Sequence, residues 1–273
     1  MAMRLHFLLA RRVPPVTSPV LAEAFDLLTR RGFHVTSSIA EEMVSRADEI
    51  EPAHDLYVLK SHTELSLGIA GILHERGART LNPFPACATV QNKIIAARVL
   101  RAAGIRAPET WITGDFALLR TLAESRTLIV KPYLGHRGAG ISIVRSPHDI
   151  AALAPSSTPM VVQTLLPGRG EDLKVYVVGD EVFAVRKPFS ETSFTVPGEP
   201  CAVTPEVRRM ALACGRTFGI GLFGLDIIET DDGPFVVDVN TFPGYKGVPR
   251  IAPRIAEYIA EAALGRVALG VAS

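Results

Sequence analysis

The segment GLDIIETDDGPFVVDVNTFPGYKG, residues 224–247, is the most informative part of the sequence for both fold and chemistry. Its two apolar runs turn at Asp231-Asp232-Gly233, the pattern of a β-hairpin. Asp238 and Asn240 are two residues apart and face one side of their strand, and Asp226 can reach the same face from the neighbouring strand. Such oxygen ligands suit a Mg²⁺ ion that bridges nucleotide phosphates. We interpret all three as metal ligands; the alternative is a polar, solvent-facing edge.

A glycine-rich loop precedes this hairpin in the segment VKPYLGHRGAG, residues 130–140. Lys131 ends a predicted strand, and glycines such as Gly138 and Gly140 would let backbone N–H groups approach phosphate oxygens. Arg137 adds a second positive charge. The loop joins two strands and lacks the GKT signature, so it is not a Walker loop. The alternative is a mobile hairpin with a surface lysine.

The segment VVQTLLPGRGEDLKVYVVG, residues 161–179, connects an apolar strand that ends near Gln163 to a further strand. A linker of this kind can hold a flat base through its backbone, although a plain inter-domain connection would have the same pattern. Lys174 and Arg186 lie on the two strands of a predicted hairpin that turns at Gly179-Asp180. Because their flanks are apolar, we expect both side chains to point into one cleft.

Strand and helix signals alternate over residues 1–85, which predicts a parallel sheet covered by helices. Residues 86–162 begin with a strong helix that closes at Gly104 and continue with strands around the glycine loop. Residues 163–273 contain two antiparallel hairpins and end in a helix. The expected fold class is therefore α/β followed by α+β, with an N-terminal domain and two further lobes at these boundaries.

Composition narrows the class of protein. Hydrophobic residues make up 48% of the chain and the net charge is +1, which favours a packed globular enzyme and argues against nucleic-acid binding. Three widely spaced cysteines predict reduced thiols rather than a zinc site. The first apolar run is short and is interpreted as a strand rather than a signal peptide. No run is long enough for a membrane span, so we expect a cytoplasmic protein.

Taken together and in this order, the three segments resemble the ATP-grasp superfamily. The resemblance covers about residues 80–262 and implies an ATP-grasp fold, in which an N-terminal parallel α/β domain accompanies two lobes that clasp ATP. It also implies ATP and Mg²⁺, or Mn²⁺, as cofactors. The hairpin carrying Asp226, Asp238 and Asn240 is similar to the metal-binding end of the family, although the first ligand is Asp where the ligases usually have Glu.

The resemblance also assigns roles to residues. It implies that Lys93 and Lys131 contact ATP phosphates and that the loop 135–140, with Arg137, Gly138 and Gly140, closes over them. It implies that Gln163 and Leu166 frame the adenine and that Glu171 or Asp172 lies near the ribose. It implies that Lys174 and Arg186 face the γ-phosphate and the acceptor. These expectations concern the following residues: Lys93, Lys131, Arg137, Gly138, Gly140, Gln163, Leu166, Glu171, Asp172, Lys174 and Arg186.

Two branches of the superfamily compete. The glycine loop and the chain length resemble the amino-acid ligases that add glutamate to a ribosomal protein, a lysine-biosynthesis carrier or peptides, through an acyl phosphate. The segments DVNTFPGYKGV and LKVYVVGDEVFAVRKPF resemble the inositol polyphosphate kinases, but the loop GHRGAG lacks the histidine segment of those kinases. We favour the ligase. A non-catalytic nucleotide-binding regulator is a third reading, which the intact Lys131 and metal ligands disfavour.

The acceptor is expected to be a small molecule or a peptide, with no nucleic acid and no membrane as partner. Lys60, Ser61 and His62 follow an apolar strand at a place where sheet ends form ligand crevices, so they are candidate substrate contacts or else a plain loop. The sequence leaves a homo-oligomer open.

Overall fold

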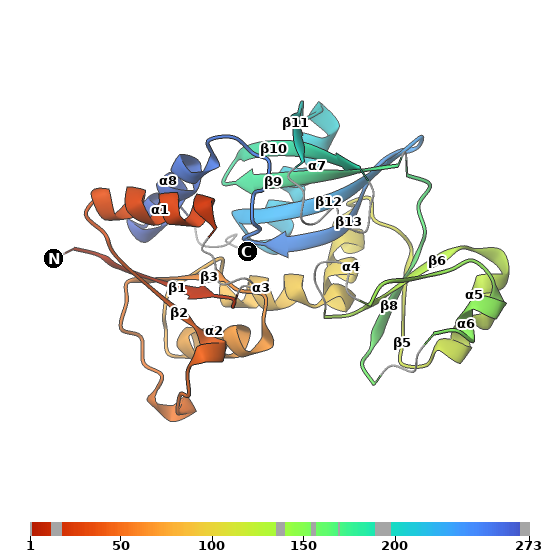
Figure 1. Ribbon diagram of the computed structural model, residues 1–273, viewed down its shortest axis with the longest axis horizontal. Helices are drawn as coiled ribbons and strands as arrows, with labels where there is room; N and C mark the ends of the chain where they lie inside the picture. The colour runs from red at the N-terminus through yellow and green to blue at the C-terminus, as the bar shows by residue number, and fades with distance from the viewer. Residues whose placement is uncertain are drawn as a thin grey trace.

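Three separate sheets organise the chain, as Figure 1 shows for the computed structural model. The structure describes residues 2–11, 18–134, 140–153, 157–168, 170–188 and 198–267. Besides the helices and strands given below, these described residues contain three 3₁₀ turns, at Ala40–Glu42, Ala47–Glu49 and Phe116–Leu119.

The N-terminal sheet is parallel and has the strand order β2-β1-β3-β4. Its strands are β1 (Arg4–Leu9), β2 (His34–Ile39), β3 (Leu56–Lys60) and β4 (Thr80–Leu81). Helix α1 (Pro19–Arg30) covers one face, because Leu21, Ala24 and Leu28 recur at helical spacing and are buried. Helices α2 (Glu64–Glu75) and α3 (Phe84–Gln91) contribute to the core on the other face.

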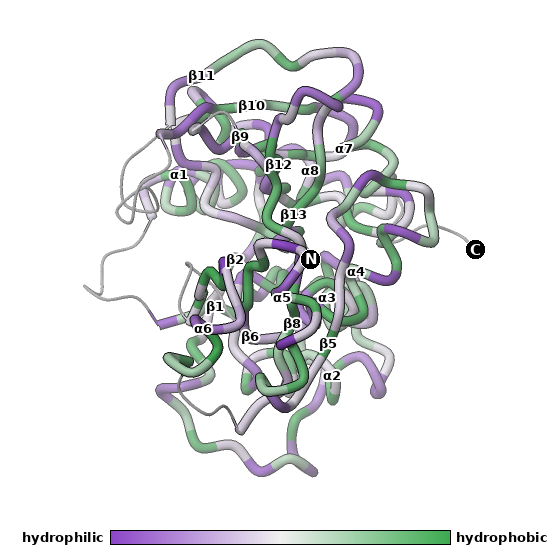
Figure 2. Tube along the Cα trace, turned by 90° about the vertical axis from the view of Figure 1, so that its right-hand side faces the viewer, coloured by the Kyte–Doolittle hydropathy of each residue, from purple (hydrophilic) through white to green (hydrophobic). Residues whose placement is uncertain are grey.

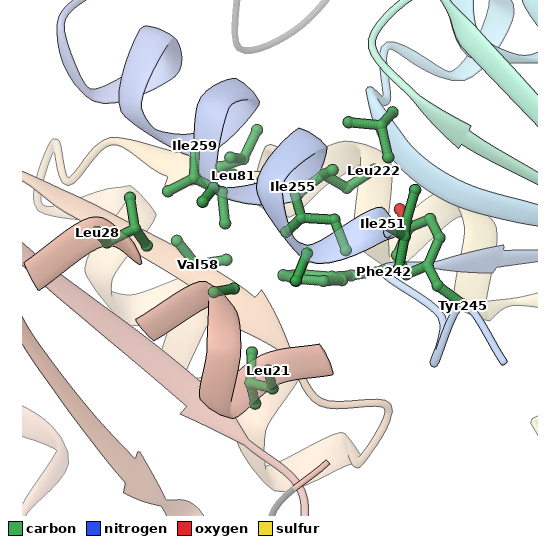
Figure 3. Close-up of a cluster of buried hydrophobic side chains, with 14 of the residues drawn as sticks. Leu21, Leu28, Val58, Leu81, Leu222, Phe242, Tyr245, Ile251, Ile255 and Ile259 are labelled. Carbon is green, nitrogen blue, oxygen red and sulfur yellow. The ribbon is translucent and has the colours of Figure 1, made fainter. Parts of the chain in front are cut away.

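The last helix of the chain belongs to this same core. Helix α8 (Ile251–Ala263) lies beside α1 (Figure 1), and its isoleucines form one cluster with side chains of α1 and β3, in which Ile251 lies beside Phe242 and Tyr245 (Figure 3). Arg79 donates hydrogen bonds to the carbonyl oxygens of Ala262 and Ala263 at the C-terminal end of α8. The expected boundary at residue 163 therefore does not separate the two ends of the chain, which share one hydrophobic core.

The central sheet is antiparallel and has the order β5-β8-β6-β7. Its elements are β5 (Thr110–Thr113), α5 (Arg120–Ser125), β6 (Leu128–Pro132), β7 (Ser142–Val144), α6 (Pro147–Ile150) and β8 (Met160–Thr164). The small apolar core of this lobe lies between the sheet and its two short helices (Figure 1). The expected boundary at residue 162 falls inside β8.

The C-terminal sheet is antiparallel and has the order β11-β10-β9-β12-β13. Its elements are β9 (Glu171–Val178), β10 (Glu181–Pro188), β11 (Glu199–Cys201), α7 (Pro205–Phe218), β12 (Leu222–Thr230) and β13 (Gly233–Thr241). Gly219 ends α7 in the left-handed region, and Gly233 turns the last hairpin with a positive φ, conformations that glycine adopts at little cost.

The single strong helix expected near residues 88–104 is two helices. Helix α3 ends at Gln91 and helix α4 (Lys93–Ala102) begins one residue later. The break arises at Asn92, which leaves the helical conformation and accepts hydrogen bonds from the backbone N–H groups of Ile94 and Ile95. Residues of α4 pack into the core beneath β9, β12 and β13.

Hydrophobic and hydrophilic stretches are interspersed along the whole trace, and no lobe is of one kind throughout (Figure 2). This is the pattern of elements that each bury one face. Within the part of the chain that the structure describes, no helix has the length and apolar character needed to cross a bilayer.

Candidate active site

The three predicted metal ligands meet on the hairpin of β12 and β13. Asp226 stands directly opposite Asp238, and Asn240 stands opposite Gly224. The side chains of Val236 and Val239 point into the core against α4, and a register shift after Asp226 lets the strand carry Asp238 out of that core. The strands thus present two carboxylates and one amide as neighbours, the arrangement that the hairpin pattern predicted.

Each of the two carboxylates is held by a lysine from another element. Lys93 Nζ, at the first residue of α4, lies 2.5 Å from Asp238 Oδ1, and Lys174 Nζ on β9 lies 3.0 Å from Asp226 Oδ2. Burial acts to raise the pKa of Asp238, but the ammonium groups of Lys93 and Lys131 outweigh it and hold that pKa below its ordinary value. The carboxyl group of Asp238 is therefore ionised at neutral pH.

Lys131 joins the central sheet to the C-terminal sheet. Its side chain is buried, and Nζ donates a hydrogen bond of 3.0 Å to the carbonyl oxygen of Val237, the residue before Asp238. Burial lowers the pKa of Lys131, although the nearby carboxylate of Asp238 opposes this effect. A buried ammonium group that makes a backbone contact beside a carboxylate is placed to receive phosphate oxygens.

A recess lies between α4, β6, β8 and β13, and Lys93, Lys131, Gln163 and Asp238 contribute to its lining. Gln163 is buried on β8, where its Nε2 donates to Thr110 Oγ1 at 3.2 Å. Leu166 follows β8 and is partly exposed in the connection to β9. The predicted adenine residues thus lie at the junction of the two lobes.

Asp172 and Glu171 point to opposite faces of β9. Asp172 lies on the face of Lys174, with Oδ2 at 3.5 Å from Lys174 Nζ, whereas Glu171 lies near Arg186. Burial raises the pKa of Asp172, and Lys174 partly offsets this rise. Of the two candidates for the ribose, only Asp172 therefore shares a face with the predicted phosphate-binding lysines.

The expectation that Arg186 shares a cleft with Lys174 is wrong. Lys174 stands opposite Val185, whereas Arg186 stands opposite Leu173, whose side chain packs into the core beneath α7. Successive residues of a strand face opposite sides, so Arg186 lies on the far face of the sheet. There its guanidinium pairs with Glu229 at 2.6 Å.

Lys187 is a candidate site residue to which sequence reasoning gave no role. It stands opposite Asp172 on β10, is buried, and lies on the face of Lys174. Burial lowers the pKa of Lys187, and Lys174 and Lys246 lower it further. The two-residue turn at Gly179-Asp180 pairs Val178 with Glu181, and counting back along both strands would have placed Lys187, not Arg186, in the cleft.

The glycine loop is described only at its ends. Arg137 and Gly138 lie outside the described residues. Gly140 has a φ of +72°, and a Cβ at this position would approach Pro132 Cγ to 2.9 Å, so glycine alone fits between the loop and β6.

The donor set fits magnesium. Among the residues that the structure describes, no group of three or more His, Cys, Asp or Glu side chains forms a metal site. Two carboxylates and an amide are hard oxygen donors, and magnesium is commonly held by one or two carboxylates together with substrate phosphates. Asp226, Asp238 and Asn240 would hold such an ion beside a triphosphate.

Comparison with known sequences identifies relatives among the ATP-grasp ligases. Residues 90–262 match the family of the RimK-like ATP-grasp domain. A probable alpha-L-glutamate ligase from a Shewanella species is 27% identical over 210 residues, which cover 70% of each chain. A probable alpha-L-glutamate ligase from Citrobacter koseri is 28% identical over 203 residues, 67% of this chain and 68% of the relative.

Solved structures share the fold. A RimK domain ATP-grasp protein from Sphaerobacter thermophilus superposes with a TM-score of 0.75 at 19% identity, covering 93% of this chain and 98% of that chain. The D-alanine–D-alanine ligase of Bacillus anthracis, solved with ATP, gives a TM-score of 0.70 at 18% identity and covers 97% and 98%. The ATP-grasp ligase PsnB, solved with a precursor, Mg and ADP, gives 0.66 at 21% identity and covers 94% and 96%.

Proposed function

The chain belongs to the RimK-like ATP-grasp family, and from this premise we propose that it is an ATP-dependent ligase that joins a carboxylate to an amine. The observation that supports the proposal is the set of lysines, Lys93, Lys131 and Lys174, gathered from three elements around Asp226 and Asp238. Phosphoryl transfer depends on such positioning and charge neutralisation more than on covalent catalysis.

The reaction has two chemical steps. A carboxylate oxygen of one substrate bonds to the γ-phosphorus of ATP while the bond to the β–γ bridging oxygen breaks, so ADP leaves and an acyl phosphate remains. The neutral amine then bonds to the acyl carbon, inorganic phosphate leaves with the bonding electrons of the C–O bond, and the nitrogen gives up one proton to solvent. Lys131 and Lys93 would contact the phosphates, and Asp172 the ribose. Lys174 and Lys187 would face the γ-phosphate and the acyl group.

Asp226, Asp238 and Asn240 would hold Mg²⁺, or Mn²⁺, which when bound offsets negative charge on the phosphate oxygens. Asp226 and Asp238 each pair with a lysine in this structure. If the two carboxylates held the metal ion instead, Lys174 and Lys93 would be free to contact phosphate oxygens. The lobe junction at Lys131 and Gln163 would shield the acyl phosphate from water.

Family membership supports the ligase over the kinase that the segment DVNTFPGYKGV also resembles. The names of the glutamate ligase relatives make L-glutamate the first amine to try. PsnB has also been solved with a precursor peptide, so the acceptor to be tested is a peptide as well as a small molecule. A regulator that only binds nucleotide would release no ADP with any acceptor.

The test is an ADP-release assay in which hydroxylamine traps acyl phosphates as hydroxamates. N-acetylated amino acids serve as carboxylates, and the mass of each product is recorded. We expect hydroxamate from the native chain and a loss of about a hundredfold or more in Asp238→Asn. Asp232→Asn, in the hairpin turn, is the matched control and should retain activity. A phosphate ester as the only product would instead identify a kinase, and full activity of Asp238→Asn would refute the metal assignment.

A further inference from the structure

A second polar cluster lies outside the set of lysines, at the carboxyl edge of the N-terminal sheet. Leu9 pairs with Ile39 and with Lys60, so β1, β2 and β3 end level with one another. The residues that follow these strands converge there, and ligands of open parallel sheets bind at such an edge. We call Glu41, Ser61, Thr63 and Ser66 the edge cluster.

Hydrogen bonds hold the edge cluster together. Thr63 Oγ1 donates to Glu41 Oε1 and lies 3.2 Å from Ser61 Oγ. Thr63 also caps helix α2 by accepting from the backbone N–H of Ser66 at 3.3 Å. Ser61 and Ser66 are buried. Glu41 therefore has one oxygen fixed by a defined partner, and its carboxylate orientation is set.

The other oxygen, Glu41 Oε2, is buried and has no hydrogen-bond partner among the described residues. Arg11 does not supply one, because its guanidinium donates to the backbone oxygen of Glu41 and pairs with the side chain of Glu42. A buried carboxylate oxygen without a donor costs free energy, so this position calls for a donor that the described chain does not provide.

The edge cluster adjoins the predicted reaction centre by two contacts. Lys60 Nζ lies 5.1 Å from the centre of the Phe242 ring, two residues after Asn240. Gln91 Nε2 donates to the carbonyl oxygen of Ser61 at 3.5 Å, and Gln91 lies two residues before Lys93. A group bound at the edge cluster would therefore lie on the acceptor side of the site rather than at the nucleotide.

From this arrangement we propose that Glu41 binds the ammonium group of the amine substrate, with the hydroxyl groups of Ser61 and Thr63 beside it. The inference rests on the proposed ligase function. A primary amine arrives mainly as its ammonium ion at neutral pH, and a carboxylate oxygen that lacks a donor is the complement of that ion. The ammonium group then loses one proton to solvent, and the lone pair of the free amine attacks the acyl carbon. Glu41 is thus a positioning residue for a primary ammonium.

The test compares Glu41→Gln with Glu42→Gln, its exposed neighbour. Proteinogenic amino acids serve as amines, and hydroxylamine, which is uncharged at neutral pH, serves as the nucleophile that needs no ammonium site. For Glu41→Gln we expect kcat/KM for amide formation to fall by about tenfold or more through a higher KM for the amine. The KM for ATP and the hydroxamate rate should stay within about twofold of the native values.

The outcomes separate the two proposals. If the native chain forms no hydroxamate, the ligase function itself fails. If it does, and Glu41→Gln keeps native amide formation or loses both products equally, Glu41 does not bind the amine. Hydroxamate formation by the native chain without any amide would also overturn the inference. Glutamine can keep the bond from Thr63, and a thermal melt unchanged from that of Glu42→Gln would exclude a purely structural effect.

Discussion

Lys187 and Arg186 are neighbours in the sequence but occupy opposite faces of β10. Lys187 shares a face with Lys174 and Asp172, whereas Arg186 pairs with Glu229 and Glu171 on the far face. Successive residues of a strand point to opposite faces of the sheet. Lys187 therefore lies on the face of the predicted site, whereas Arg186 forms ion pairs on the other face.

The pair allows a matched experiment at the residue scale. Lys187→Met should lower kcat/KM by about tenfold or more, since it removes a buried ammonium group near the predicted acyl group. Arg186→Met should leave activity unchanged and cost only about 0.5 kcal/mol of stability, because its ion pairs are partly exposed. Hydroxamate assays and urea titrations on both variants measure this. A larger loss of activity in Arg186→Met than in Lys187→Met would show that Arg186, and not Lys187, belongs to the active site.

At the scale of elements, the break between α3 and α4 positions Lys93. Asn92 ends one helix and caps the next, so Lys93 becomes the first residue of α4 and reaches Asp238. In one continuous helix, Lys93 would follow the rotation set by α3, and its side chain would not be directed at Asp238.

Asn92→Ala should therefore affect both stability and nucleotide binding. Loss of the cap costs about 1 kcal/mol of unfolding free energy, and the KM for ATP should rise as Lys93 loses its position. Thr204→Ala removes the cap of α7, which accepts from Val207 at 3.2 Å, and is the control. It should show a similar stability loss with an unchanged KM for ATP. Equal KM values in the two variants would contradict the role of the break.

The N-terminal sheet has a pH-sensitive element of its own. His6 on β1 lies between the hydroxyl groups of Thr36 and Ser38 at 2.8 Å, and its ring lies 4.7 Å from that of His54. Burial, with a smaller effect of His54, lowers the pKa of His6 from 6.5 to about 4. The unfolded chain therefore binds more protons than the folded chain between these pH values.

Stability should consequently rise with pH over this window and be lost as the pH falls from 6.5 toward 4. We expect the free energy of unfolding to change by about 1–2 kcal/mol across the window. This is less than the full pKa shift would give at about 1.4 kcal/mol per unit, because His6 is only half-buried and solvent screens its charge. Urea unfolding of the native chain and of His6→Gln across the window measures it. His148→Gln is the control. An unchanged slope in His6→Gln would show that other groups cause the acid sensitivity.

At the scale of the whole molecule, the six lysines are confined to one region. The chain has 29 lysines and arginines, and its lysines are Lys60, Lys93, Lys131, Lys174, Lys187 and Lys246. Lys93, Lys131 and Lys174 contact Asp238, Val237 and Asp226, and Lys174 and Lys246 are close enough to Lys187 to lower its pKa. Lys60 lies over the ring of Phe242, while arginines form the surface ion pairs. Three sheets, α4 and the loop after β13 contribute these lysines, so the region exists only when the lobes are assembled.

A lysine-selective acylating reagent should therefore modify only this region and the N-terminal amine. With MgATP present, we expect labelling of Lys93, Lys131 and Lys174 to fall by about fivefold or more, because phosphate oxygens occupy their amines. Lys246 is an exposed residue of the loop after β13 and has no proposed contact with the phosphates, so it should label at the same rate in both conditions and is the internal control. Peptide mass spectrometry reads each site. Uniform protection, or none, would contradict nucleotide binding at these lysines.

The sequence by itself determined most elements, the hairpin of Asp226, Asp238 and Asn240, and the family. These follow from local periodicity, from turn residues and from the two-residue repeat of a strand, which need no knowledge of distant contacts. The turn at Gly179-Asp180 also fixes the strand register that places Lys187 opposite Asp172, so this position follows from the sequence as well.

The elements that share a core and the side chains that meet across lobes could be identified only from the folded molecule. Helix α8 completes the N-terminal core from the far end of the chain, and Lys131 crosses to Val237. Asn92 breaks a segment whose periodicity favours one helix. Burial and hydrogen bonding between distant segments outweigh local propensity. A local sequence pattern carries no information on which distant segment will pack against it.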